Sequence, residues 1–286
     1  MSSVTAASRL RRAMQEGIVM APGAPDPLTA RLVERAGFPA VYMTGFGATA
    51  SRLGMPDIGL LTQTEMAEHA RNMTRAVSIP VIADADTGYG GPSNIHRTVR
   101  EYVQAGVAAL HLEDQVAPKR CGQRAGIRLM PAEENAERLR CAVEARGDDD
   151  LLIIGRTDAI SAEGPEEAIR RAKLYQEAGV DLVFVDGIKK IAEVEAVARH
   201  VQGPKIVSIV DGNETVALKA ADLQAMGFSI VLYAVTTLFA AVKASEAALA
   251  DLRQAGTPAG DRGVSYALFS EMVGLPFHDG LADRFG

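Results

Sequence analysis

The sequence contains few cysteines and few aromatic residues, and it has no long apolar run. Its 2 Cys, Cys121 and Cys141, form no CxxC pair, which excludes a disulfide framework and favours a reducing, cytoplasmic location. The longest apolar stretch, 229–242, contains Thr236 and Thr237 and is shorter than the roughly 20 residues that span a bilayer. A transmembrane segment is therefore not expected.

An excess of positive charge is also missing. The formal net charge is −6, and no segment combines clustered Lys and Arg with aromatic side chains. Such a chain lacks the electrostatic footprint that binds a phosphate backbone or an anionic membrane. We expect neither nucleic acid nor a membrane as a partner.

What the sequence does contain is a series of short runs rich in Val, Ile and Leu, each bounded by Gly, Pro or Asp. The runs show no polar alternation, which is typical of parallel strands covered on both faces. Eight such strands are predicted: Ile18–Ala21, Ala40–Thr44, Pro80–Asp84, Val107–Glu113, Leu151–Arg156, Asp181–Asp186, Lys205–Val210 and Ser229–Ala234.

Helical signals separate these runs, such as the capping-box spacing of Thr62 and Glu65. The eightfold alternation predicts an α/β fold, a (β/α)₈ TIM barrel, over residues 1–286, with a doubly wound sheet as the alternative. Two helical patterns, 238–254 and 265–273, follow the eighth strand, one more than barrel closure needs. We expect residues 255–286 to form a helical tail that can pack on another subunit.

Acidic residues end several of the predicted strands, where the chemistry of such barrels is located. Asp84 and Asp86 follow the third strand, and Glu113 ends the fourth. Carboxylates that converge on one rim repel each other unless a cation neutralises them, and oxygen ligands without Cys or His favour Mg²⁺, or Mn²⁺, over zinc. Capping of the following helices is the simpler structural explanation for each acid alone.

Two basic side chains end strands beside this acidic cluster. Arg156 is either an ion-pair partner for the acids or a bidentate clamp for a substrate carboxylate, and we favour the clamp. His111 lies two residues before Glu113 and so faces the same side of its strand. It is either a hydrogen-bond donor to substrate or a packed interior residue.

The long segment after the fourth strand carries Lys119-Arg120-Cys121-Gly122-Gln123. Neighbouring cations would lower the pKa of the Cys121 thiol, and a mobile, partly exposed loop would bring it into the site on closure. Cys121 is therefore a candidate general acid or base. Cys141 lies on a helical pattern and is expected to pack.

A glycine-containing segment, Gly45-Phe46-Gly47-Ala48-Thr49-Ala50, follows the second strand. It resembles a nucleotide-binding loop, but such a loop opens straight into a helix, whereas Gly54, Pro56 and Gly59 interrupt the chain here. We interpret Thr44 and the backbone amides of the segment, including Gly45, Phe46 and Gly47, as a cradle for a substrate carboxylate.

Together these motifs resemble the isocitrate lyase and phosphoenolpyruvate mutase superfamily over almost the whole chain. The motifs are Tyr42-x-Thr44-Gly45, Asp84-x-Asp86-x-Gly88-Tyr89-Gly90, Glu113-Asp114-Gln115, Pro118-Lys119-Arg120-Cys121-Gly122 and Arg156-Thr157-Asp158-Ala159. The resemblance implies a Mg²⁺-dependent barrel that acts through enolates of keto acids. It also implies a homotetramer, built as a dimer of dimers that exchange a C-terminal helix.

The resemblance also implies a role for each matching residue. Asp84 would contact the metal, and Asp57, Asp86 and Glu113 would hold its waters. Thr44, Gly45 and Arg156 would bind the keto-acid half of the substrate, and Cys121 would protonate the departing enolate. Tyr42 and Lys119 join the catalytic set, and Gly122, Gln123, Asp186 and Ser208 join the substrate-binding set.

Three departures from the lyase pattern leave the reaction open. Gln123 replaces the expected His, Asp186 the expected Glu, and Ser208 the expected Asn. Gln cannot relay a proton. We predict a lyase that cleaves a 2-hydroxy di- or tricarboxylic acid of the methylisocitrate or 2-alkylmalate type to a 2-keto acid. An oxaloacetate decarboxylase, a phosphonopyruvate-processing enzyme and a non-catalytic barrel that binds small anions are the alternatives.

Overall fold

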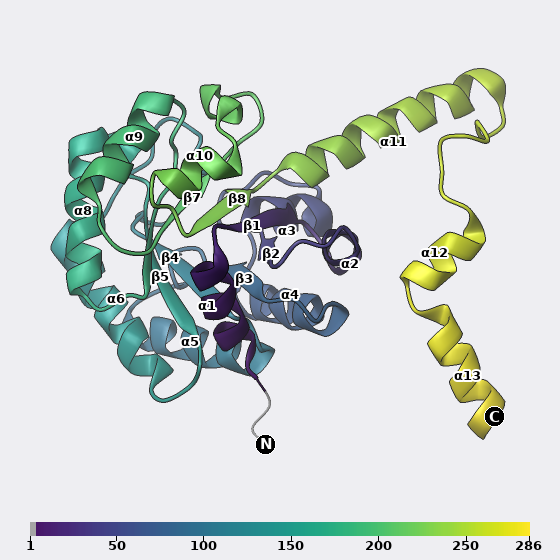
Figure 1. Cartoon of the computed structure of the whole chain (residues 1–286), viewed down its shortest axis with the longest axis horizontal. Coiled ribbons are helices and arrows are strands. Elements are labelled where there is room, and N and C mark those ends of the chain that lie inside the picture. The colour runs from purple at the N-terminus through teal and green to yellow at the C-terminus, as the bar shows by residue number, and fades with distance from the viewer. Residues whose placement is uncertain (1–3) are drawn as a thin grey trace. The chain divides into compact units, whose positions relative to one another are not determined.

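The computed structural model describes residues 4–286 and divides the chain into two compact units, one ending at Thr236 and the other running from Thr237 to Gly286. Residues 1–3, part of the predicted 1–286 domain, lie outside the described residues. The first unit confirms the predicted fold. Its eight strands pair in parallel in chain order, and the eighth closes on the first to complete a barrel (Figure 1).

All eight predicted runs overlap an observed strand. The strands are β1 (Val19–Ala24), β2 (Val41–Met43), β3 (Val81–Asp84), β4 (Ala109–Glu113), β5 (Leu152–Thr157), β6 (Leu182–Val185), β7 (Lys205–Ser208) and β8 (Ile230–Tyr233). They are three to six residues long, and both faces of each are largely buried. Burial on both faces explains why the sequence shows apolar runs instead of alternation.

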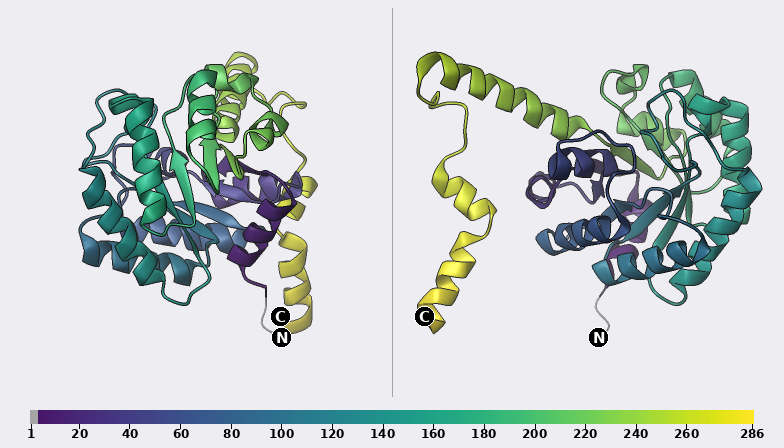
Figure 2. Two further views of the ribbon diagram at one scale, coloured as in Figure 1. Left: turned by 60° about the vertical axis from the view of Figure 1, so that its left-hand side comes forward. Right: turned by 180° about the vertical axis from the view of Figure 1, so that it is seen from behind.

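Helices connect the strands and cover the outside of the barrel (Figure 2). In the first unit they are α1 (Ala6–Glu16), α2 (Pro27–Arg35), α3 (Gly45–Leu53), α4 (Gln63–Ala76), α5 (Pro92–Ala105), α6 (Ala132–Arg146), α7 (Ala159–Ala162), α8 (Pro165–Glu177), α9 (Ile191–His200), the 3₁₀ turn η1 (Glu214–Ala217) and α10 (Ala220–Ala225). The predicted capping box at the start of α4 is present, since the side chains of Thr62 and Glu65 each accept the other's backbone N–H.

Apolar side chains fill the barrel interior at the amino ends of the strands. Each strand contributes alternate residues, for example Ile154 from β5 and Leu182 from β6. Ala7 and Leu10 of α1 belong to the same buried cluster, so this helix closes the amino-terminal end of the barrel. The barrel is therefore a packed core that leaves room for chemistry at the opposite rim.

The second unit consists of the helices α11 (Thr236–Ala255), α12 (Tyr266–Met272) and α13 (Leu275–Phe285). The two predicted helical patterns correspond to α11 and α12, and α13 was not predicted. No side chain in these three helices is buried, and large apolar residues such as Tyr266, Phe277 and Phe285 are exposed. Among the described residues, no helix has the length and hydropathy to cross a membrane.

Candidate active site

Polar residues occupy the inward-facing positions at the carboxyl ends of the strands. In β4 the interior residue Ala109 is followed at two-residue intervals by His111 and Glu113. The same spacing leads from buried interior residues to Thr44, Asp84, Arg156, Asp186 and Ser208 on the neighbouring strands. Strand alternation therefore brings most of the predicted site residues to one rim.

Asp84 ends β3, and two backbone amides hold its carboxylate. The N–H of Gly45 donates to Oδ2 at 3.1 Å, and the N–H of Asp86 donates to Oδ1 at 2.9 Å. A Cβ at position 45 would lie 2.5 Å from Oδ2, so glycine is needed for this approach. Burial alone would raise the pKa of Asp84, but the electrostatic influence of His111 and Lys119 outweighs it and lowers the pKa to about 2.

Tyr42 and His111 form a buried pair beside this carboxylate. Tyr42 Oη lies 3.0 Å from His111 Nε2, and His111 Nδ1 lies 3.7 Å from Asp84 Oδ1 without a hydrogen-bond partner. Burial raises the pKa of Tyr42 and lowers that of His111 to about 4, so both side chains are neutral near pH 7. In the tautomer in which Tyr42 donates to Nε2, the Nδ1 proton of His111 is available to a substrate oxygen.

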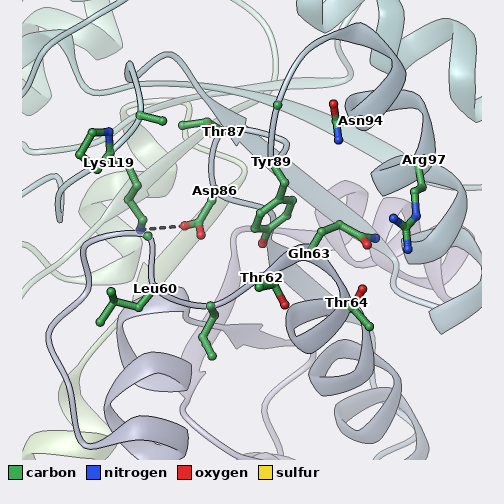
Figure 3. A pocket seen from close by; sticks show the side chains of 15 residues that line it. Leu60, Thr62, Gln63, Thr64, Asp86, Thr87, Tyr89, Asn94, Arg97 and Lys119 are labelled. Atoms are coloured by element: carbon green, nitrogen blue, oxygen red, sulfur yellow. Dashed lines mark ion pairs between the residues drawn. The ribbon is translucent and has the colours of Figure 1, made fainter.

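Lys119 lies in the loop after β4, and its ammonium bridges two of the predicted metal-site acids. Nζ is 2.5 Å from Asp57 Oδ1 and 2.7 Å from Asp86 Oδ1, and the lysine side chain is 4% exposed. Burial opposes the charge, but Asp86 and the other acids raise the pKa of Lys119 well above its usual value. A cavity of about 500 Å³, which Tyr89 also lines, opens beside this ion pair (Figure 3). This space suffices for a small acid.

Arg156, the second-last residue of β5, lies among three carboxylates. Its Nη2 lies 2.7 Å from Asp186 Oδ2, 3.0 Å from Asp158 Oδ1 and 3.4 Å from Glu113 Oε2. The guanidinium carbon lies 5.5 Å from the centre of the Phe184 ring. Both roles considered for Arg156 fit this geometry, since its ion pairs orient a charged guanidinium at the mouth of the barrel.

Acidic groups outnumber basic ones at this rim. Asp57, Asp84, Asp86, Glu113, Asp158 and Asp186 face Lys119 and Arg156. Both carboxylate oxygens of Glu113 are buried without a hydrogen-bond partner, and burial raises the pKa of Glu113 well above its usual value. Burial also raises the pKa of Asp86, to about 6. Further positive charge would stabilise the ionised forms of both acids.

These donors fit a magnesium ion that keeps most of its water. Within residues 4–286, no three His, Cys, Asp or Glu side chains converge as a ready-made ligand cluster. Mg²⁺ does not need one, because it commonly binds through one or two carboxylates and retains several waters. The ionised, backbone-held Asp84 suits direct contact, and the unpartnered Glu113 suits a bound water.

Cys121 lies in the 18-residue loop 114–131 between β4 and α6. The expectation that neighbouring cations lower its pKa is wrong, because burial, with Asp186 adding to it, raises the pKa of the thiol to about 11. The ammonium of Lys119 instead pairs with acids, and the Arg120 guanidinium donates to the carbonyl of Ala125. A thiol that stays protonated near pH 7 suits a proton donor.

The residues after Cys121 pack on the Arg156 cluster. A Cβ on Gly122 would lie 2.6 Å from Asp158 Oδ1 and 2.7 Å from Asp186 Oδ2. Gln123 Oε1 accepts a hydrogen bond from Asn213 at 3.0 Å, while its Nε2 is buried without a partner. The structure thus places the loop against the site. The Nε2 group of Gln123 is left to donate a hydrogen bond to a further ligand.

The segment Gly45–Leu53 forms helix α3 directly after β2, so the expectation that no helix opens there is wrong. Thr44 is the N-cap, and its side chain accepts from the N–H of Gly47 at 3.3 Å. The helix ends at Gly54, whose φ of 61° is left-handed, before Pro56 is reached. Phe46 lies half-buried in the first turn. The amides of Gly45 and Gly47 thus bind Asp84 and Thr44 in this structure.

Two residues of the site were not among the predicted site residues. Asp158 accepts hydrogen bonds from Arg156 at 3.0 and 3.2 Å, and the Phe184 ring contacts both His111 and Arg156. Asp158 lies two residues after Arg156 and so shares its inward direction, a signal that the sequence contains. Phe184 lies two residues before Asp186 and so faces the same side of its strand, but an apolar residue gives no chemical signal of a site.

The fold and site belong to a known class of barrel enzymes. Residues 10–253 match the family model described as phosphoenolpyruvate phosphomutase. The chain is a member of this family, the phosphoenolpyruvate mutase and isocitrate lyase superfamily, as its motifs predict.

Individual relatives are similar along nearly the whole chain. The chain is 41% identical to 2,3-dimethylmalate lyase from Eubacterium barkeri, over 95% of this chain and 94% of that protein. It is 41% identical to 2-methylisocitrate lyase from Aeropyrum pernix, over 92% and 84%. A crystal structure of 2,3-dimethylmalate lyase matches with a TM-score of 0.93 at 38% identity, over 99% and 96% of the two chains. A structure of oxaloacetate acetylhydrolase matches with a TM-score of 0.92 at 33% identity, over 98% and 97%.

Proposed function

We propose that this protein is a Mg²⁺-dependent carbon–carbon lyase. Its substrate would be a small 2-hydroxy di- or tricarboxylic acid of the 2-methylisocitrate or 2-alkylmalate type, cleaved to a 2-keto acid such as pyruvate and a second acid. The observation that carries the proposal is geometric: the loop that bears Cys121 packs through Gly122 against Asp158 and Asp186, at the rim where Arg156 and the acidic residues gather. The relatives named as lyases support the same class of reaction.

The keto-acid half of the substrate would lie between Asp84 and Arg156. A bound Mg²⁺ would act as a Lewis acid for the negative charge that develops on the keto-acid oxygens. Asp84 would hold the ion, and Asp57, Asp86 and Glu113 would hold its waters. Arg156 would pair with the substrate carboxylate, because its guanidinium is charged and oriented by three acids.

Cleavage would proceed by breaking the bond between the hydroxyl-bearing carbon and its neighbour. The hydroxyl would give its proton to an ionised carboxylate of the rim and become the carbonyl of the keto acid, while the electron pair of the broken bond remains on the departing carbon. Cys121 would donate its proton to that carbon. Tyr42 and His111, both neutral, would hydrogen-bond the oxygen at the reacting centre, and Lys119 would keep the nearby acids ionised.

Cleavage of oxaloacetate is the second candidate function. The oxaloacetate acetylhydrolase structure overlays this chain almost as well as the lyase structure does. Gln123, Asp186 and Ser208 also depart from the lyase pattern at three substrate-facing positions. We favour the alkylmalate or methylisocitrate type because two relatives named as lyases of such substrates are each 41% identical to this chain.

We further propose that the protein is cytoplasmic and forms a homotetramer from pairs of subunits that exchange a C-terminal helix. The exposed apolar residues of α11, α12 and α13 support this assembly, because such surfaces favour burial against a partner. Light scattering at micromolar concentration measures the mass. A mass equal to that of one chain would reject the proposed tetramer, and the proposed reaction would be unaffected.

A panel assay tests the reaction. Release of pyruvate and glyoxylate, and of oxalate from oxaloacetate, is followed with 2,3-dimethylmalate, other 2-substituted malates, 2-methylisocitrate, isocitrate and oxaloacetate, each with and without Mg²⁺. We expect Mg²⁺-dependent release of keto acid from a 2-alkylated substrate at the highest kcat/KM. Preference for oxaloacetate would favour the second candidate, and no release from any substrate would reject both.

A further inference from the structure

Gln115, two residues after the end of β4, connects the Cys121 loop to the Arg156 cluster. Its side chain is buried, with the residue 1% exposed. Gln115 Oε1 accepts from the backbone N–H of Arg120 at 2.8 Å, and Nε2 donates to the backbone carbonyl of Arg120 at 2.7 Å. Nε2 also donates to Asp158 Oδ2 at 2.8 Å. One amide group thus makes three hydrogen bonds.

The chemistry of these partners fixes the orientation of the Gln115 amide. A backbone N–H can only donate, whereas a backbone carbonyl and a carboxylate can only accept. The oxygen must therefore face the N–H of Arg120, and the NH₂ must face the two acceptors. Rotating the amide by 180° would set oxygen against two oxygens. Both NH₂ protons and the carbonyl oxygen are used, so only an amide side chain satisfies this pattern, and Asn is one methylene shorter.

The two ends of this bridge lie next to the groups that carry the proposed chemistry. Arg120 stands between Lys119, which pairs with Asp57 and Asp86, and Cys121, the proposed proton donor. Asp158 orients the guanidinium of Arg156 through hydrogen bonds at 3.0 and 3.2 Å. A shift of Arg120 or of Asp158 would change the distance between the Cys121 thiol and the Arg156 guanidinium.

We propose that Gln115 is a positioning residue that sets the register between the Cys121 loop and the Arg156 clamp. This inference rests on the proposed lyase function for its kinetic consequence, but its structural part does not depend on the reaction. By comparison, the hydrogen bond that Ser161 Oγ donates to the carbonyl of Gly122 at 3.0 Å holds a single backbone atom of the loop. Gln115 hydrogen-bonds both the backbone N–H and the backbone carbonyl of Arg120, and it also donates to the buried carboxylate of Asp158.

The decisive change is Gln115→Glu, which keeps the length of the side chain and the acceptor for the N–H of Arg120. The substitution replaces the Nε2 donor with a carboxylate oxygen. The carbonyl of Arg120 and the carboxylate of Asp158 then lose the hydrogen bonds that Nε2 donates to them. We expect kcat for the best substrate to fall on the order of 100-fold while KM changes less than threefold. The same change at the exposed Gln104 of α5 is the matched control and should leave both constants unchanged.

A second readout does not depend on activity. Limited trypsin digestion cuts after Lys119, Arg120 or Arg124 when the loop leaves its packed position. We expect cleavage of the folded Gln115→Glu protein at these bonds to be at least tenfold faster than that of wild type and of Gln104→Glu. Gln115→Met, which removes the hydrogen bonds without adding charge, should give the same acceleration and serves if the Glu variant does not fold.

The outcomes separate the two proposals. If wild type releases no keto acid but Gln115→Glu and Gln115→Met are cut faster, the proposed function fails and the positioning role of Gln115 stands. If wild type is an active lyase and both variants match it in kcat and in trypsin cleavage, the positioning role is overturned and the function stands. A rise in KM with unchanged kcat would also overturn it, because Gln115 would then serve binding alone.

Discussion

The barrel interior has two ends with opposite chemistry, although the same eight strands build both. At the amino end, residues such as Ile154 and Leu182 pack in an apolar cluster that α1 closes. Two to four residues further along the same strands, Arg156 and Asp186 stand among buried charges. The distance between the two environments is only about 7 to 13 Å, at roughly 3.3 Å per residue.

This difference separates stability from chemistry along each strand. Apolar side chains at the amino end gain free energy from burial, at about 25 cal/mol per Å². The carboxylates at the carboxyl end cost free energy to bury unless they are paired. The apolar end can thus hold the barrel together while the polar rim keeps groups such as Glu113 without a hydrogen-bond partner. Substitutions at the two ends should therefore have different consequences.

The largest effect is expected at Asp84. Asp84→Ala removes the carboxylate that we propose to contact Mg²⁺, and with it the Lewis acid that stabilises the negative charge on the keto-acid oxygens. Turnover should fall by at least about 1000-fold, while circular dichroism shows an intact barrel. Near-normal turnover of the variant at saturating Mg²⁺ would contradict the assignment of Asp84 as a metal ligand.

Arg156→Lys should have the next largest effect. A lysine ammonium is a point charge and cannot replace a guanidinium that contacts Asp158, Asp186 and a substrate carboxylate in fixed directions. We expect kcat/KM to fall on the order of 100-fold, in line with about 3 kcal/mol of lost transition-state binding. If kcat/KM is unchanged, Arg156 does not bind the substrate carboxylate and serves only as an ion-pair partner of the acidic residues.

Leu182→Ala tests the opposite end of the same interior. Leu182 is 2% exposed and belongs to the apolar cluster, four residues before Asp186. Its truncation should lower the free energy of unfolding by about 2–5 kcal/mol. The kcat of the remaining folded protein should change less than threefold. A loss of kcat as large as that of Arg156→Lys would mean that the two ends are not separate.

The smallest effect is expected for Gln123→His, which restores the residue of the lyase pattern. The unpartnered Nε2 of Gln123 is replaced by an imidazole that titrates near pH 6.5. The pH profile of kcat should gain a limb in this range, with less than a tenfold change at pH 7.5. If pH dependence and substrate preference both stay unchanged, the side chain at position 123 does not face the reaction.

The sequence was sufficient to predict the rim but not the loop that packs on it. Alternate residues of a strand face the same side, so the positions of Asp84, Glu113 and Arg156 near the strand ends predict that their side chains meet at the carboxyl-terminal rim of the barrel. The partners of Lys119 and the burial of Cys121 depend on the path of an 18-residue connection. Local charge therefore predicted a low thiol pKa, whereas tertiary burial raises it.

A similar limit applies to α3. Gly54, Pro56 and Gly59 suggested that no helix opens after the second strand, because glycine and proline are poor helix formers. The helix instead begins after the N-cap Thr44, with Gly45 held against Asp84, and ends before these residues. Contacts between strands β2 and β3 decide the structure here, and such contacts cannot be read from a single segment.

The most direct test of the account is the cleavage rate of Cys121→Ser beside Cys141→Ser, at saturating Mg²⁺ and substrate. A serine hydroxyl is a much weaker acid than a thiol, so kcat of Cys121→Ser should fall about 100-fold with little change in KM. Cys141→Ser should behave as wild type. Because the protonated thiol is the active form and its pKa is about 11, the thiol should cause no loss of wild-type kcat between pH 7 and 9. Equal kcat for both variants would contradict the assignment of Cys121 as the proton donor.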